Sequence, residues 1–201
     1  MEISLFDRIN QLDTDSVTVD RKDLLKPIKE YLILKTQQKV IPQLNFICTH
    51  NSRRSQLSQV WANVVADFYG YNVNCFSGGT EITACNERTI ASFERMGFTL
   101  LNPGGENPHY ELSYHENKTP IVLFSKIYND FPNPKNNFAA VMTCSHADKN
   151  CPFIPGSDKR IALPYEDPKA ADDTPKEAET YDERSLQIAA EMKYVFCDLL
   201  G

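Results

Sequence analysis

The feature that most restricts the fold of this chain is an apolar run that leads, through a short polar loop, into an amphipathic helix. Leu44-Asn45-Phe46-Ile47 is typical of a buried strand, and Gly70 is expected to end the helix. The helix is predicted from apolar residues at i, i+3, i+4, i+7, i+8 and i+11, namely Leu57, Val60, Trp61, Val64, Val65 and Phe68. A strand joined directly to a helix is typical of α/β proteins with a parallel sheet.

The same alternation of strands and helices continues along the chain. Further strands are expected at 71–76, 120–124, 138–143 and 160–164, and further helices at 86–96 and 175–200. Residues 102–118 and 128–137 are rich in Asn and Pro, and we predict loops there. We therefore expect a parallel sheet covered on both faces, with its active site at the carboxyl ends of the strands.

Residues 1–42 precede this pattern and are predicted to form a helical extension. Apolar residues recur at helical spacing from Leu5 to Leu12 and again from Leu24 to Leu34, with Asp20 as the expected N-cap of the second helix. We divide the chain into this extension and an α/β domain at 43–201. The sequence assigns no chemistry to the extension.

The composition excludes several classes of function. A formal net charge of −6 disfavours nucleic acid as a partner, because phosphate contacts require clustered Lys and Arg. No apolar run is long enough to span a membrane, and the first residues lack the apolar stretch of a signal peptide. We therefore expect a cytoplasmic protein whose six cysteines are free thiols. The sequence gives no indication of the oligomeric state.

The Cys48 loop (residues 48–55) has the composition of an oxyanion site. We expect Arg54 to bind a tetrahedral oxyanion bidentately, and Cys48 to act as a nucleophilic thiolate favoured by the positive environment. Ser55 would donate a hydrogen bond to the sulfur, and Asn51 tolerates the left-handed backbone of a tight loop. The oxyanion would be bound by Thr49, His50, Asn51, Ser52, Arg53 and Arg54, together with the helix N-terminus. The alternative is a buried cysteine beside two solvated arginines.

Two further cysteines follow the buried strand at 138–143. Cys144 and Cys151 are separated by a polar run of six residues, which favours a functional pair. A zinc half-site with His146 is a second interpretation, although no fourth ligand is evident. Unreactive packing residues are a third. Farther along, Asp167 precedes Pro168, a pair that by itself indicates only a turn.

The motif Cys48-Thr49-His50-Asn51-Ser52-Arg53-Arg54-Ser55-Gln56 resembles the phosphate-binding Cys-x5-Arg loop of low-molecular-weight protein tyrosine phosphatases. It resembles even more the loop of the related thioredoxin-coupled arsenate reductases. Ser77-Gly78-Gly79-Thr80 is similar to the turn after the second strand of that family. The resemblance runs from about residue 44 to the C-terminus, interrupted by extra loop sequence. It implies a flavodoxin-like α/β fold with a parallel four-stranded sheet, the low-molecular-weight phosphatase fold.

The spacing of Cys144 and Cys151 resembles the redox pair of those arsenate reductases. The resemblance implies that Cys48 attacks arsenate, that Cys144 then attacks Cys48 and releases arsenite, and that Cys151 forms a disulfide with Cys144. Thioredoxin would reduce that disulfide. Asp167 would be the general acid that protonates the leaving oxygen. The implied partners are an arsenate or phosphate oxyanion and thioredoxin. No metal and no cofactor is expected. Potassium in particular is not predicted, because Gln59 stands where some reductases carry a Glu that helps to hold it.

Departures from the family pattern keep two other functions open. His50 stands where the family usually has Gly, and Arg53 stands where many relatives have a second Cys. A phosphatase acting on phosphotyrosine or small phosphate monoesters would need only Cys48, Arg54 and Asp167, and would form a phosphocysteine. A non-catalytic anion sensor or partner-binding module is the third possibility. We favour the arsenate reductase, because of the second cysteine pair.

Overall fold

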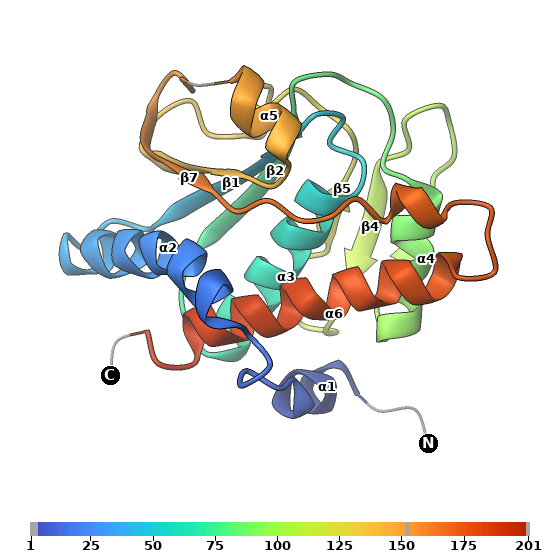
Figure 1. The fold of residues 1–201 in the computed structure, drawn as a ribbon, viewed down its shortest axis with the longest axis horizontal. Coiled ribbons are helices and arrows are strands. Elements are labelled where there is room, and N and C mark those ends of the chain that lie inside the picture. Colours follow the sequence, from blue (N-terminus) through green and yellow to red (C-terminus); the bar gives the residue numbers. More distant parts are fainter. Residues whose placement is uncertain (1–3, 152, 200–201) are drawn as a thin grey trace.

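The computed structural model describes residues 4–151 and 153–199. Its centre is a four-stranded sheet in which every neighbouring pair is parallel (Figure 1). The order is β2-β1-β6-β7, with β1 (Gln43–Cys48), β2 (Asn74–Gly79), β6 (Phe138–Met142) and β7 (Ser157–Ala162). This is the order of a flavodoxin-like sheet, so the predicted fold class is confirmed.

The two faces of the sheet are covered unequally. One face packs against α3 (Arg54–Phe68), which packs in turn against α6 (Glu177–Phe196). The helix α4 (Glu87–Met96) packs against α6, and all three helices share the large hydrophobic core (Figure 1). The other face carries a small core with α5 (Ser145–Asn150) and the loops around Tyr128 and Ile154. Side chains of β1 and β6 alternate between the two cores, as expected for strands buried on both faces.

The N-terminal residues form the two helices expected from their apolar spacing. These are α1 (Leu5–Gln11) and α2 (Val19–Gln37), and their buried side chains join the large core beside α6 (Figure 1). Arg21 of α2 donates two hydrogen bonds to the carboxylate of Glu191 on α6, at 2.8 and 2.7 Å. The expected N-cap was wrong: the hydroxyl of Thr18 caps α2, and Asp20 lies inside its first turn.

A second sheet lies where the sequence predicted mostly loop. It is antiparallel, in the order β3 (Thr99–Leu101), β4 (Tyr110–Ser113) and β5 (Ile121–Leu123). The strand expected at 120–124 is confirmed as β5, whereas the loop expected over 102–118 contains β4. None of the described helices is long and apolar enough to cross a membrane.

Candidate active site

The Cys48 loop joins the carboxyl end of β1 to the N-terminus of α3. Cys48 is the last residue of the strand and Arg54 the first of the helix. Arg53 occupies the N-cap position without a side-chain hydrogen bond to the first turn, so the loop interior faces helix N–H groups that lack a capping side chain. Asn51 has φ 46°, the left-handed conformation expected from its residue type.

The end of β2 supports the loop from below. The N–H of Thr80 donates to the carbonyl oxygens of Cys48 and Thr49, at 3.2 and 2.8 Å. Gly79 permits this approach, because a Cβ there would lie 2.7 Å from the Thr49 carbonyl oxygen and 2.9 Å from the Asn51 nitrogen. Ser77, Gly78 and Gly79, expected in a turn, are the last residues of β2, and with Thr80 this strand end fixes the backbone of the loop.

Buried hydrogen bonds orient the Cys48 thiol. Its Sγ lies 3.1 Å from Ser55 Oγ, and Asn51 Nδ2 donates to the same Oγ at 2.9 Å. Because Ser55 Oγ accepts from Asn51, its own proton is free to point at the sulfur. Asn51 is held in turn by the N–H of Lys126, which donates to Asn51 Oδ1 at 3.1 Å. This chain of contacts fixes the position of the Cys48 sulfur in the loop.

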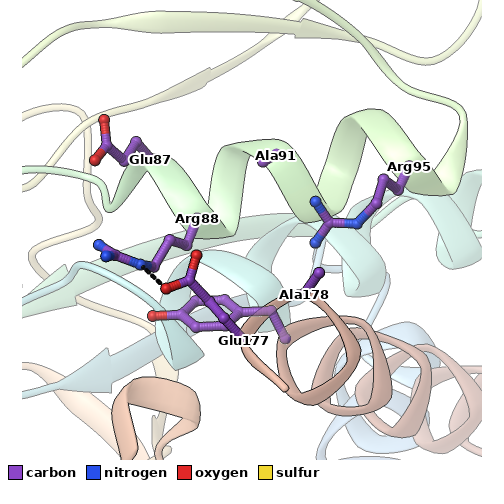
Figure 2. A pocket seen from close by; sticks show the side chains of 7 residues that line it. Glu87, Arg88, Ala91, Arg95, Glu177 and Ala178 are labelled. Atoms are coloured by element: carbon purple, nitrogen blue, oxygen red, sulfur yellow. Dashed lines mark hydrogen bonds and ion pairs between the residues drawn. The ribbon is translucent and has the colours of Figure 1, made fainter. Parts of the chain in front are cut away.

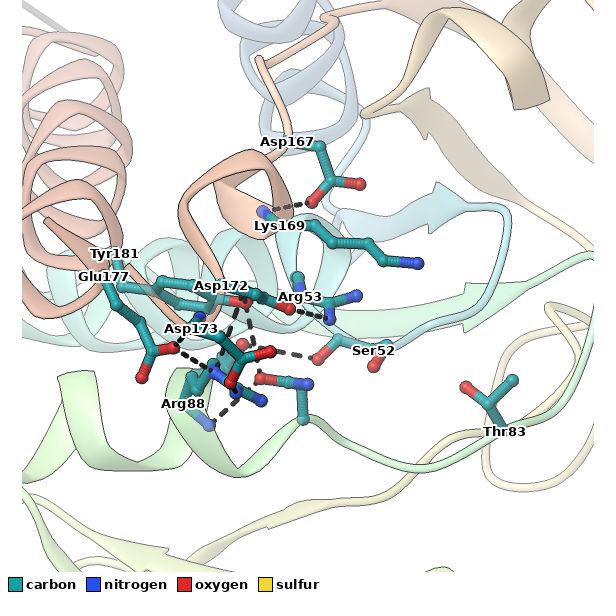
Figure 3. A network of polar contacts seen from close by, with 12 residues as sticks. Ser52, Arg53, Thr83, Arg88, Asp167, Lys169, Asp172, Asp173, Glu177 and Tyr181 are labelled. Carbon is teal, nitrogen blue, oxygen red and sulfur yellow. Dashed lines mark hydrogen bonds and ion pairs between the residues drawn. The ribbon is translucent and has the colours of Figure 1, made fainter. Parts of the chain in front are cut away.

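Arg54 and Asp167 meet at the mouth of the loop although they are far apart in sequence. Arg54 Nη2 donates to Asp167 Oδ2 at 2.6 Å, and Nη1 donates to the Tyr165 carbonyl oxygen at 3.1 Å. The buried Nε of Arg54 has no hydrogen-bond partner within the described residues. Asp167 also accepts from the N–H of Lys169 at the start of the 3₁₀ helix η1 (Pro168–Ala171), as Figure 3 shows. Arg54 therefore offers one free donor beside a carboxylate.

The side chain of Arg53 is engaged elsewhere. Its Nε donates to Tyr181 Oη at 2.7 Å and its Nη2 donates to Asp172 Oδ2 at 3.1 Å, while Tyr181 donates to Asp172 Oδ1 at 2.7 Å (Figure 3). Burial, followed by the bond to Asp172, raises the pKa of Tyr181. An anion in the loop could therefore accept a hydrogen bond from the backbone N–H of Arg53. The guanidinium of Arg53 is already paired with Tyr181 and Asp172.

Arg88 extends this network to α4 and α6. It donates to Glu177 Oε2 and Asp173 Oδ1, both at 2.6 Å (Figures 2 and 3). The bond to Glu177 is the main reason that the pKa of Arg88 is raised, and the same bond lowers the pKa of Glu177. The segment that follows Asp167 is thus tied to both helices. The nearby pocket of about 350 Å³ lies between α4 and α6 (Figure 2).

The second cysteine segment (residues 144–151) begins one strand away from the loop. Cys144 follows β6, the neighbour of β1, and only 1% of it is exposed. Thr49 Oγ1 lies 3.5 Å from Cys144 Sγ and 3.2 Å from His146 Nδ1, so this side chain bridges the two segments. His146 is therefore paired with Thr49.

A short helix separates the two cysteines of this segment. Cys144 caps the start of α5, because its Sγ accepts from the N–H of Ala147 at 3.3 Å. Cys151, which is half-buried, follows the helix, and its N–H donates to the Ala147 carbonyl oxygen at 3.0 Å. Among the described residues, no three His, Cys, Asp or Glu side chains gather as a metal site, which leaves the zinc interpretation without geometric support.

Several curated arsenate reductases are similar to this chain. The arsenate reductase of Staphylococcus aureus strain Newman is 30% identical over 124 residues, which span 61% of this chain and 76% of that protein. Arsenate reductase 1 of Staphylococcus saprophyticus is 30% identical over 123 residues, with the same shares covered. The chain belongs to the family of arsenate reductases and low-molecular-weight protein tyrosine phosphatases. No family model matches the chain.

Solved structures agree with this family on the fold. A low-molecular-weight phosphotyrosine phosphatase from Vibrio cholerae O395 has a TM-score of 0.53 at 14% identity, covering 78% of this chain and 95% of that one. An arsenate reductase in the phosphate-binding state has a TM-score of 0.52 at 15% identity, covering 79% and 99%. Membership of the family identifies the chain as an enzyme, so the non-catalytic interpretation is not supported.

Cys75 and Cys85, which lie outside the family motifs, are buried in the core. Burial raises the pKa of Cys75, and burial raises that of Cys85 to about 12. Both thiols are therefore neutral and unreactive at physiological pH, as is typical of packing residues.

Cys85 also lines a pocket of about 560 Å³ beside His50 and Ser52, and the loop residue Glu106 forms part of the pocket wall. The loop that contains Glu106 thus borders the side of the Cys48 loop where His50 departs from the family pattern.

Proposed function

We propose that this enzyme reduces arsenate to arsenite through a relay of Cys48, Cys144 and Cys151, with thioredoxin as the reductant. The observation that carries the proposal is the bridge between the two cysteine segments: Thr49, next to Cys48, contacts the sulfur of Cys144. Two thiols at the carboxyl ends of neighbouring parallel strands can exchange a covalent adduct without a large movement of the sheet. A phosphatase has no use for this second thiol.

The first step would be attack on bound arsenate. The loop N–H groups and the N-terminus of α3 would hold the oxyanion, and Arg54 Nε would supply a further donor. An incoming oxyanion competes with Asp167 for the Arg54 guanidinium, which would release the carboxyl group to act as the acid. The Cys48 thiolate forms a sulfur–arsenic bond, and the leaving oxygen departs as water with a proton from Asp167.

The second and third steps would be thiol exchanges. The Cys144 thiolate attacks Cys48 Sγ, and the electron pair of the sulfur–arsenic bond stays on arsenic, which leaves as arsenite. Cys151 then attacks Cys144 and frees Cys48. The ends of the second cysteine segment are roughly 10 Å apart along a helix, and a disulfide requires Cα atoms within about 7 Å. Consequently α5 must uncoil before Cys151 can reach Cys144.

Phosphate ester hydrolysis is the second candidate, because Cys48, Arg54 and Asp167 alone could perform it. Cys48 and Arg54 stand in the same loop, Arg54 contacts Asp167, and phosphate is close to arsenate in shape and charge. Lys169 and two alanines follow the Asp-Pro pair, so no aromatic side chain of η1 is available to grip a phosphotyrosine ring. We therefore expect only weak hydrolysis of aryl phosphates.

The test is arsenate-dependent oxidation of NADPH with thioredoxin and thioredoxin reductase. Turnover should fall to background in Cys144→Ser and in Cys151→Ser, whereas the matched control Cys197→Ser should keep the wild-type rate. Wild-type protein that is silent with arsenate but hydrolyses an aryl phosphate in a Cys48-dependent manner would replace this proposal with the phosphatase. The relay also agrees with a cytoplasmic location, where thioredoxin keeps thiols reduced.

A further inference from the structure

Arg160 holds the carboxyl end of the short helix between the two relay cysteines. It lies on β7, opposite Ala140 of β6, and its side chain reaches α5. Its Nε donates to the Cys151 carbonyl oxygen at 2.9 Å. Its Nη2 donates to the Asp148 carboxylate at 2.6 Å and also to the Asp148 carbonyl oxygen. One guanidinium therefore contacts three acceptors at the end of the helix, two on Asp148 and one on the C-cap residue Cys151.

These contacts supply hydrogen-bond donors to the carboxyl end of α5, which so short a helix cannot provide itself. The last carbonyl groups of a helix have no partner inside it, and a cation at this end is favoured by the helix dipole. The planar guanidinium can satisfy several acceptors at once from a fixed position. Since the backbone of Arg160 is fixed by pairing with β6, the side chain anchors α5 to the sheet.

The same contacts are incompatible with a disulfide between Cys144 and Cys151. When α5 uncoils, the carbonyl groups of Asp148 and Cys151 leave their helical positions, and the acceptors of Arg160 separate. Cys144 is held at the opposite end, by Thr49 and by the N–H of Ala147, so the movement must occur at the Cys151 end. Arg160 can therefore make all three contacts only in the dithiol state, in which α5 is helical.

We propose that Arg160 is a latch, a positioning residue that stabilises the dithiol state of the second cysteine segment and makes its disulfide easier to reduce. This inference rests on the relay of the proposed function. In the exchange concerned, Cys151 thiolate attacks Cys144 Sγ, the bond between Cys48 and Cys144 breaks, and Cys48 leaves as a thiolate. Arg160 changes the equilibrium by favouring the reduced partner, as stabilised dithiols do in strongly oxidising disulfides.

The test measures the reduction potential of the Cys144–Cys151 pair in the full chain. A parent carrying Cys48→Ser and Cys197→Ser leaves only this pair accessible, and it is equilibrated with thioredoxin redox buffers. Adding Arg160→Met should favour the disulfide roughly tenfold, which corresponds to a potential about 30 mV more negative. Arg160→Lys should restore part of the shift, because an ammonium can satisfy some of the acceptors.

Arg95→Met is the matched control. Arg95 makes a bidentate contact with the Asp182 carboxylate, at 2.8 Å for both bonds, and this contact joins α4 to α6. It should leave the potential unchanged. An equal shift in Arg95→Met and Arg160→Met, or no shift in Arg160→Met, would overturn the latch while the relay stands. A parent that forms no Cys144–Cys151 disulfide would overturn the relay itself, and the latch with it.

Discussion

The Cys48 loop and the second cysteine segment carry the same reactive group, yet the fold holds them in opposite ways. Hydrogen bonds fix the loop from inside, between Cys48 and Ser55, and from outside, through Thr80 after β2 and the backbone of Lys126. The second segment is a short helix on the thinly covered face of the sheet, held by Thr49 and Arg160. A site that stabilises charge should be preformed, whereas a disulfide relay has to move.

The largest effect is expected from removing the nucleophile of the Cys48 loop. Cys48→Ser should lower arsenate reduction by at least ~10⁴-fold, because no other group can form the first covalent bond. Phosphate binding, measured by titration calorimetry, should change only severalfold because the preformed donors remain. Loss of phosphate binding together with activity would show that the loop depends on the thiol for its shape.

Removing the planar donor of the loop should have the next largest effect. Arg54→Lys keeps the charge but loses the fork that contacts Asp167 and the free Nε donor. We expect kcat/KM with arsenate to fall about 10²- to 10³-fold, and phosphate binding to weaken as well. Arg53→Lys is the control: its guanidinium contacts Tyr181 and Asp172, so it should affect stability more than catalysis.

Asn51 tests how rigid the loop is. Asn51→Ala retains the left-handed backbone of φ 46° with a less suitable side chain, and loses the buried bonds to Ser55 and to Lys126. The free energy of unfolding should fall by about 2–4 kcal/mol. Asn51→Gly relieves the backbone but not the lost hydrogen bonds. Urea unfolding of both variants separates the two contributions, and equal stability of Asn51→Ala and wild type would contradict a preorganised loop.

The smallest expected effect concerns a charge buried beneath the loop. Burial lowers the pKa of Lys126 to about 8, from 10.5 for a free lysine. Below pH 8 the lysine is protonated in both the folded and unfolded states, and the fold bears the full cost of burying the charge. As the pH rises from 8 to 10.5, the folded protein releases this proton before the unfolded protein does. The free energy of unfolding therefore increases over this range, because the cost of burying the charge disappears.

Lys126→Met should therefore stabilise the protein at pH 7 by about 1–2 kcal/mol, and the gain should shrink as the pH approaches 10.5. Urea unfolding at pH 7 and pH 10 measures both values. A stabilisation that does not depend on pH would mean that the difference in stability between Lys126→Met and the wild type comes from packing and not from charge.

The Cys48 loop is easier to predict from the sequence than the second cysteine segment. The Cys48 loop could be identified because its strand, its cysteine, its arginine and its helix are consecutive, and Asn51 marks the turn. The helix α5 was missed, because Ser145-His146-Ala147-Asp148-Lys149-Asn150 is too short and too poor in helix formers to fold alone. It forms through Cys144 as its cap and Arg160 from β7, contacts that only the order of the strands brings together.

Other misses have the same origin. The strand β4 has only four residues, in which buried Tyr110 and Leu112 alternate with exposed Glu111, within a segment rich in Pro and Gly. The partners of Arg53, Asp172 and Tyr181, are more than a hundred residues away, and nothing in the local sequence points to them. Local patterns therefore predicted elements and the loop, while tertiary packing decided which charges were paired.

The most direct test of the three-thiol account is a single turnover without reductant. Fully reduced protein is mixed with excess arsenate, arsenite is quantified, and the disulfides are mapped by mass spectrometry. The account predicts one arsenite per chain and a Cys144–Cys151 disulfide, whereas Cys151→Ser should also release one arsenite but stop at Cys48–Cys144. Absence of arsenite, or arsenite released while all three thiols stay reduced, would contradict it.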